Sequence, residues 1–74
     1  MKMTRYVYLF DTDVPDLLCF GEIASDILNS SPGSGCEFNV QTKLLKVKNT
    51  ELLINEIKQI FERYQVNYNL LDNK

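Results

Sequence analysis

The sequence predicts an α+β fold in which four strands and two helices follow one another in the order β-α-β-β-α-β. Two segments, residues 14–29 and about 50–65, have apolar residues at helical spacing. The segments before, between and after them are rich in β-branched and aromatic residues or alternate between apolar and polar ones. The chain of 74 residues predicts a single domain, 1–74, near the lower size limit for a self-sufficient hydrophobic core.

Residues 4–10, TRYVYLF, predict the first strand, because β-branched and aromatic residues favour strands. Both faces of this strand are apolar, with Val7 and Leu9 on one face and three aromatic residues on the other. A strand that is apolar on both faces is typical of the middle of a covered sheet. We assign Val7 and Leu9 to the predicted core.

The first helix is expected over residues 14–29, with Asp13 as its N-cap, Pro15 in its first turn and Asp16 near the capping-box position. The segment NSSPGSG then ends the helix. The apolar residues that follow at helical spacing are Leu17, Phe20, Ala24, Ile27 and Leu28. Its opposite face carries Cys19, Glu22 and Asp26.

Two strand-like segments follow, residues 36–42 and 43–48. Their inward-facing residues are Cys36, Phe38 and Val40 in the first and Leu45 and Val47 in the second. The phase of the alternation changes between the two sets. This change predicts either a hairpin that turns near residues 42–43, which we favour, or one strand that is broken by a bulge.

The second helix is expected to be capped by Asn49 or Thr50 and to end near Gln65, and residues 66–71 form the last strand. This order of elements resembles the ferredoxin-like split βαβ fold, a four-stranded antiparallel sheet with both helices on one face. The predicted core comprises Val7, Leu9, Leu17, Phe20, Ala24, Ile27, Phe38, Val40, Val47, Ile57, Ile60, Phe61, Tyr64 and Leu70.

Charge is distributed unevenly along the chain, although the formal net charge is only −2. From Tyr6 to Thr42 there is no basic residue, and this stretch contains Asp11, Asp13, Asp16, Glu22, Asp26 and Glu37. These six carboxylates predict an acidic face for a basic partner, including a surface that mimics the phosphates of DNA. The simpler interpretation is a helix cap together with a solubilising surface.

Two enzymatic or metal-binding interpretations of the same acids are weak. The stretch FDTDVPD resembles the first motif of haloacid-dehalogenase-type phosphatases, in which Asp11 would be the nucleophile and Asp13 the general acid, but the match covers about eight residues and Val14 replaces the expected glycine. An EF-hand-like loop would use Asp11, Asp13 and Glu22, but Asp16 occupies the position that requires glycine. The sequence has no histidine, and its two cysteines do not make a zinc site. We therefore expect no catalytic residue, metal or cofactor.

The cysteines and the hydrophobic runs favour a cytoplasmic protein. Cys19 and Cys36 are expected to be free thiols, and no secretory segment or membrane-spanning run is apparent. Because so short a chain has more apolar strand surface than two helices can cover, we also expect a homodimer.

Two further functions remain as alternatives. A small RNA-binding or other nucleic-acid-binding domain of this fold would stack bases on exposed aromatic residues, for which Tyr6, Tyr8, Phe38 and Tyr68 are available. The acidic composition and the lack of an RNP-like motif disfavour direct binding of nucleic acid. A small-molecule-sensing regulatory domain would favour a glycine in the loop after the first strand, and this loop has none.

Length, an Asn-, Lys- and Ile-rich composition, cysteine usage and the acidic stretch together resemble small host-takeover proteins of phages that infect low-GC Gram-positive bacteria. Within that group the chain is most similar in character to a staphylococcal phage inhibitor of the bacterial DNA sliding clamp. The resemblance covers the whole chain and includes no motif. It implies a non-enzymatic inhibitor whose acidic surface fills a basic, DNA-binding groove of a host replication protein, the sliding clamp in particular.

Overall fold

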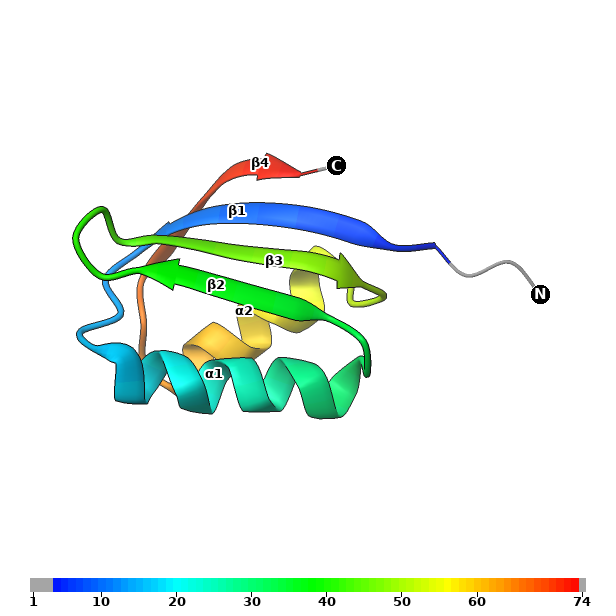
Figure 1. Ribbon diagram of the computed structural model, residues 1–74, viewed down its shortest axis with the longest axis horizontal. Coiled ribbons are helices and arrows are strands. Elements are labelled where there is room, and N and C mark those ends of the chain that lie inside the picture. Colours follow the sequence, from blue (N-terminus) through cyan, green and yellow to red (C-terminus); the bar gives the residue numbers. More distant parts are fainter. Residues whose placement is uncertain (1–3, 74) are drawn as a thin grey trace.

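The computed structural model describes residues 4–73 and confirms the predicted α+β class and order of elements. The elements are β1 (Tyr6–Thr12), α1 (Leu17–Ser30), β2 (Gly35–Asn39), β3 (Leu44–Thr50), α2 (Ile54–Arg63) and β4 (Tyr68–Asn73). The strands form one sheet in the order β2-β3-β1-β4, with antiparallel neighbours. Both helices cover the same face of this sheet, as in ferredoxin-like folds (Figure 1), and the other face is open.

The central strand β1 turns its aromatic residues, not its aliphatic ones, toward the helices. Tyr8 and Phe10 are 3% and 0% exposed, whereas Val7 and Leu9 are half-buried on the open face. The assignment of Val7 and Leu9 to the core was therefore wrong. A tyrosine can be buried at this position because its hydroxyl donates a hydrogen bond of 2.8 Å to the carbonyl of Leu52.

The core lies between the sheet and the two helices. Its centre is an aromatic cluster in which the rings of Phe10 and Phe61 meet edge to face at 4.9 Å, and those of Phe61 and Tyr68 stack at 5.1 Å. The buried hydrophobic residues are Tyr8, Phe10, Val14, Ile23, Ile27, Leu45, Val47, Leu52, Ile57, Ile60, Phe61 and Val66. The predicted places of Val47, Ile57, Ile60 and Phe61 in the core are confirmed, whereas Phe20, Ala24, Phe38, Tyr64 and Leu70 are only partly buried.

The first helix begins at Leu17, three residues later than predicted, and its N-cap is Asp16. The Asp16 carboxylate accepts a hydrogen bond of 2.8 Å from the backbone N–H of Cys19. The N-cap assignment of Asp13 was therefore wrong. The physical reason is the bond before Pro15, which disfavours helical geometry at Val14; Val14 is instead fully buried in the core.

The side of α1 that contacts the core is also rotated from the predicted stripe. Ile23 and Ile27 are fully buried, whereas Leu17 and Leu28 are 60% and 44% exposed. The prediction of Leu17 as a core residue was wrong. Apolar residues occur both on the side of Ile23 and Ile27 and on the side of Leu17 and Leu28, so helical spacing alone could not show which of these sides faces the core.

The connection between β2 and β3 is a hairpin, the favoured one of the two predicted forms. The Asn39 side-chain oxygen accepts hydrogen bonds from the N–H groups of Gln41 and Thr42, and Lys43 closes the turn at a left-handed φ of 61°. Val40 belongs to this turn and is 40% exposed, so its predicted place in the core was wrong.

The second helix begins after Leu53, whose N–H donates to the Glu56 carboxylate, and neither Asn49 nor Thr50 caps it. Thr50 is instead the fully buried last residue of β3. The helix ends in a Schellman arrangement, in which the N–H of Val66 donates to the carbonyl of Phe61 and Gln65 has a left-handed φ of 57°.

Candidate protein-binding surface

The six acids that the sequence singled out do not form one surface. Four of them, Asp11, Asp13, Asp16 and Glu22, are distributed over the end of β1, the following loop and the first turns of α1. Asp26 lies further along α1, and Glu37 lies in β2 on the open face of the sheet. We call the first four residues the acidic end.

Two observations connect the members of the acidic end in space. Asp11 and Asp13 line the same shallow pocket, together with residues of the loop and strand near Asn67. Burial raises the pKa of the Cys19 thiol, and the carboxylates of Asp16, Glu22 and Asp13 raise it further. Three carboxylates therefore lie within electrostatic reach of one sulfur atom.

Hydrogen bonds hold two of these carboxylates in place. Asp13 accepts a hydrogen bond of 2.8 Å from the backbone N–H of Asn67 and another of 2.8 Å from its side-chain amide. Asp16 is fixed by its cap bond to Cys19. The donors are neutral N–H groups, so these bonds restrict the rotamers of both carboxylates without pairing them with a positive charge.

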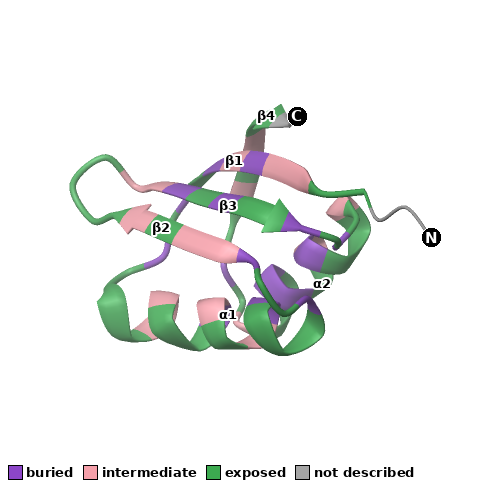
Figure 2. Ribbon diagram, turned by 45° about the vertical axis from the view of Figure 1, so that its right-hand side comes forward, coloured by how far each residue is buried: buried purple, intermediate pink, exposed green. Residues whose placement is uncertain are grey.

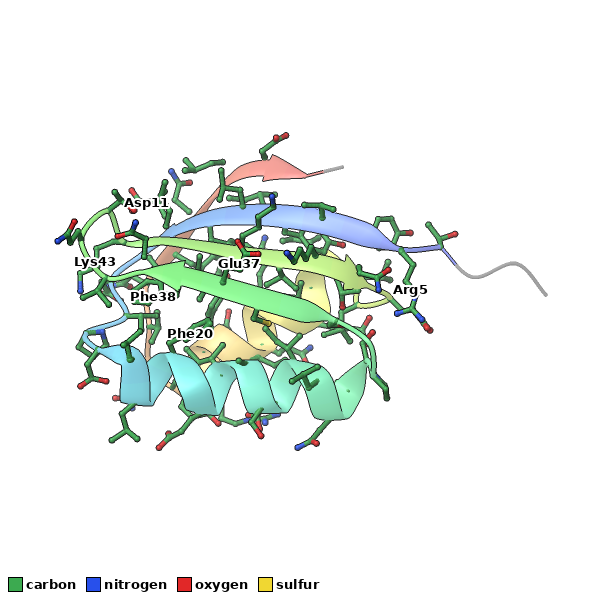
Figure 3. All side chains as sticks on the ribbon, in the orientation of Figure 1. Arg5, Asp11, Phe20, Glu37, Phe38 and Lys43 are labelled. Carbon is green, nitrogen blue, oxygen red and sulfur yellow. The ribbon has the colours of Figure 1, made fainter. Side chains whose placement is uncertain are left out.

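One basic residue approaches the acidic end. The Lys43 ammonium donates a hydrogen bond of 2.8 Å to the carbonyl of Val14, between Asp13 and Pro15 in the chain. Figure 3 places Asp11 and Lys43 at the same end of the molecule. Lys43 forms no ion pair with an acid in the part of the chain that the structure describes.

Asp26 is neutralised by a partner from α2. Its carboxylate pairs with the Arg63 guanidinium at 2.9 Å and accepts a hydrogen bond of 2.8 Å from the Tyr64 hydroxyl. This hydrogen bond to Asp26 is the largest cause of a raised Tyr64 pKa. The Asp26 carboxylate therefore joins the two helices and is less available to a partner protein than the acidic end.

Glu37 is likewise paired, in this case with Lys48 across the β2–β3 ladder. The hydrogen bond from the Lys48 ammonium lowers the pKa of the Glu37 carboxyl, and the charges of Lys48 and Lys46 act in the same direction. The pair is exposed, as expected for residues that protect the edge region of a sheet. Glu37 thus contributes to a mixed-charge surface.

The open face of the sheet has apolar residues at its centre and charged residues around them. A shallow hollow there is lined by Val7, Leu9, Lys46, Lys48 and Asp72. The aromatic residues on which bases would stack are turned the other way: Tyr8 is buried, the Phe38 ring stacks on Phe20 of α1, and Tyr68 packs on Phe61. Figure 3 shows Phe20 and Phe38 between α1 and β2.

The two cysteines are free, and neither is activated. Burial raises the pKa of the Cys36 thiol to about 11. Thiolates are the reactive form, so both side chains are poor nucleophiles near neutral pH. Within residues 4–73, no group of three or more His, Cys, Asp or Glu side chains could hold a metal ion.

The sequence did not reveal the distant residues that contact these acids, and so it did not reveal which of the six acids are ion-paired and which are not. Asn67, Arg63 and Lys48 are 54, 37 and 11 positions away from the acids that they contact. No local pattern signals such distant pairs, because they depend on how the elements pack. The stretch from Tyr6 to Thr42 contains no basic residue, but in the fold Arg63 and Lys48 from outside it pair with Asp26 and Glu37.

Comparisons of the chain with protein families and with curated proteins find no match. Neither helix within the described residues combines the length and the apolar character that are needed to cross a membrane.

Proposed function

We propose that this protein is a non-enzymatic protein-binding module whose acidic end docks into a basic, DNA-binding groove of another protein. The observation that carries the proposal is the division of the six acids. Asp26 and Glu37 are ion-paired, whereas the carboxylates of the acidic end have no ion-pair partner among the described residues. Carboxylates that have no ion-pair partner attract a positively charged surface.

Rigidity of the acidic end supports the same proposal. Asp13 is tied to Asn67 and Asp16 to Cys19, so these carboxylates are held in position before a partner arrives. A charge that is already fixed loses little conformational entropy on binding. Asp11 and Glu22 are exposed and carry the remaining charges of the acidic end.

The proposed partner is a host replication protein with a Lys- and Arg-lined groove, and specifically the bacterial DNA sliding clamp. The whole-chain resemblance to small phage inhibitors supports this choice. In this proposal the carboxylates take the place of DNA phosphates in the groove and exclude the duplex. A second copy of the chain would double the number of acidic ends in one assembly.

Charge reversals test the proposal. Titration of purified sliding clamp with an Asp11→Lys/Glu22→Lys variant is expected to give a Kd raised about tenfold or more, which corresponds to about 1.4 kcal/mol. Both side chains are exposed, so circular dichroism is expected to be unchanged. Asp72→Lys is the control, because it reverses one exposed carboxylate outside the acidic end, against two in the test variant; its Kd is expected to stay within about threefold of wild type.

The same measurement distinguishes the nucleic-acid alternative. If the protein bound RNA or DNA directly, reversal of Lys46 and Lys48 to glutamate would abolish binding, and the acid reversals would strengthen it. That pattern, or equal effects of the Asp11→Lys/Glu22→Lys and Asp72→Lys variants on the clamp, would contradict the proposal.

A further inference from the structure

The outer surface of α1 differs from that of α2 in a way that the proposed acidic end does not explain. The exposed residues of α2 are all polar: Asn55, Glu56, Gln59, Glu62 and Arg63. The exposed residues of α1 are Leu17, Leu18, Gly21, Glu22, Ser25, Leu28, Asn29 and Ser30. Every residue of α1 is described, and Glu22 is the single charged residue in this exposed set. Figure 2 shows how much of α1 faces solvent.

Four residues of α1 form a continuous apolar stripe along this surface. Leu17, Gly21, Ala24 and Leu28 are spaced by four, three and four positions and therefore share one side of the helix. Leu17 is 60% exposed and Leu28 is 44% exposed, and the neighbouring Leu18 is 75% exposed. We call these four residues the α1 stripe.

The α1 stripe points away from α2. Asp26 precedes Leu28 by two positions, which places it about 200° around the helix axis, and Asp26 is the residue that contacts Arg63 of α2. The middle of the stripe is also open, since a Cβ atom added at Gly21 would meet no atom of the rest of the protein within 4 Å. Within residues 4–73, Leu17, Gly21 and Leu28 are exposed and Ala24 is half-buried, so this side of α1 is largely uncovered.

The stripe is self-complementary. We propose that a second copy of this chain covers it, with the two α1 helices packed antiparallel about a twofold axis near Glu22 and Ile23. In that arrangement Leu17 of each copy meets Leu28 of the other, and Gly21 of each copy meets Ala24 of the other, because both pairs are symmetric about the same point of the helix. Small residues at the crossing point allow two helices to approach closely, and the leucines pack on both sides of it.

The charge of α1 favours a second copy over other occupants. A membrane surface would require lysine or arginine around the apolar face; α1 itself carries none, and Arg63, which contacts α1, pairs with Asp26 on the side away from the stripe. A strongly basic partner would prefer the acidic end to the uncharged stripe. Two uncharged stripes meet without burying an unpaired charge.

The size of the stripe sets the strength of the dimer. A 14-residue helix is about 21 Å long and about 10 Å wide, so α1 offers on the order of 200 Å² of footprint, against the roughly 800 Å² per partner in a standard interface. We therefore infer a weak dimer that dissociates on dilution.

Sedimentation equilibrium of the full chain from about 10 μM to about 1 mM tests the inference. The weight-average mass of the wild type is expected to rise from 8.6 kDa toward twice that value. A Leu17→Gln/Leu28→Gln variant is expected to raise the dissociation constant at least tenfold. Gly21→Gln is expected to do the same while the unfolding temperature of the monomer stays equal or rises, because glutamine is a better helix former than glycine. Gln59→Ala, on the polar surface of α2, is the matched control and is expected to associate like wild type.

Three results would overturn the inference. The wild type could remain at 8.6 kDa up to about 1 mM, or it could dimerise with the same constant in all the variants, which would place the interface elsewhere. A third is binding of the wild-type monomer to vesicles of neutral and anionic lipids that the double variant loses. All substitutions are neutral, so they leave the charge of the acidic end unchanged, and failure of this inference is distinguishable from failure of the proposed function.

Discussion

At the scale of residues, the fold depends on which face of β1 is buried. Tyr8 and Phe10 pack against the helices, while Val7 and Leu9 line the open face. The sequence could not decide between the two faces, since both are apolar. On the buried face, the Tyr8 hydroxyl donates a hydrogen bond to the carbonyl of Leu52, which lies 44 positions away. Long-range partners of this kind leave no local pattern.

Phe61 is the residue whose truncation tests the core most directly. It is fully buried and contacts both Phe10 and Tyr68. A Phe61→Ala variant is expected to lose about 3–5 kcal/mol of unfolding free energy, through lost burial and the cavity that remains. In so small a domain this is most of the stability, so urea denaturation should find the variant largely unfolded in water. An unchanged denaturation midpoint would contradict the described core.

At the scale of elements, most of the architecture could be predicted, and the errors concern where elements begin and end and which of their sides faces the core. The order of strands and helices follows from apolar spacing and from β-branched and aromatic composition. The phase change between Val40 and Leu45 allowed a hairpin, the favoured form, or one bulged strand, and the structure has the hairpin. The start of α1 could not be predicted as reliably, since Asp13 and Asp16 both have the chemistry of a cap. Burial of Val14 decides it, because this residue enters the core before the helix begins.

Two substitutions of Asp16 distinguish the contribution of its cap hydrogen bond to stability from that of its negative charge. Asp16→Ala removes the hydrogen bond to Cys19 and is expected to cost about 0.5–2 kcal/mol of unfolding free energy, measured by thermal or urea denaturation. Asp16→Asn keeps the cap and removes the charge, so it should cost much less stability. Equal destabilisation by the two substitutions would show that the charge of Asp16, and not its cap bond, stabilises α1.

At the scale of the whole molecule, folding brings basic residues to some acids of the acidic stretch and not to others. The topology places α2 beside α1, so that Arg63 reaches Asp26, and the β2–β3 ladder places Lys48 beside Glu37. The sequence could predict that an acidic surface exists. It could not predict that Asp26 and Glu37 are neutralised, because that result depends on packing between distant elements.

The proposed binding of the acidic end to the basic groove of a sliding clamp is best tested by the salt dependence of the affinity. Raising ionic strength from about 0.05 to about 0.5 M shortens the Debye length from roughly 14 to roughly 4 Å, which screens exposed charges. The account predicts that the Kd of the wild-type protein for the purified clamp rises at least tenfold over this range. No binding at low salt, or a Kd that is the same at both salt concentrations, would contradict it.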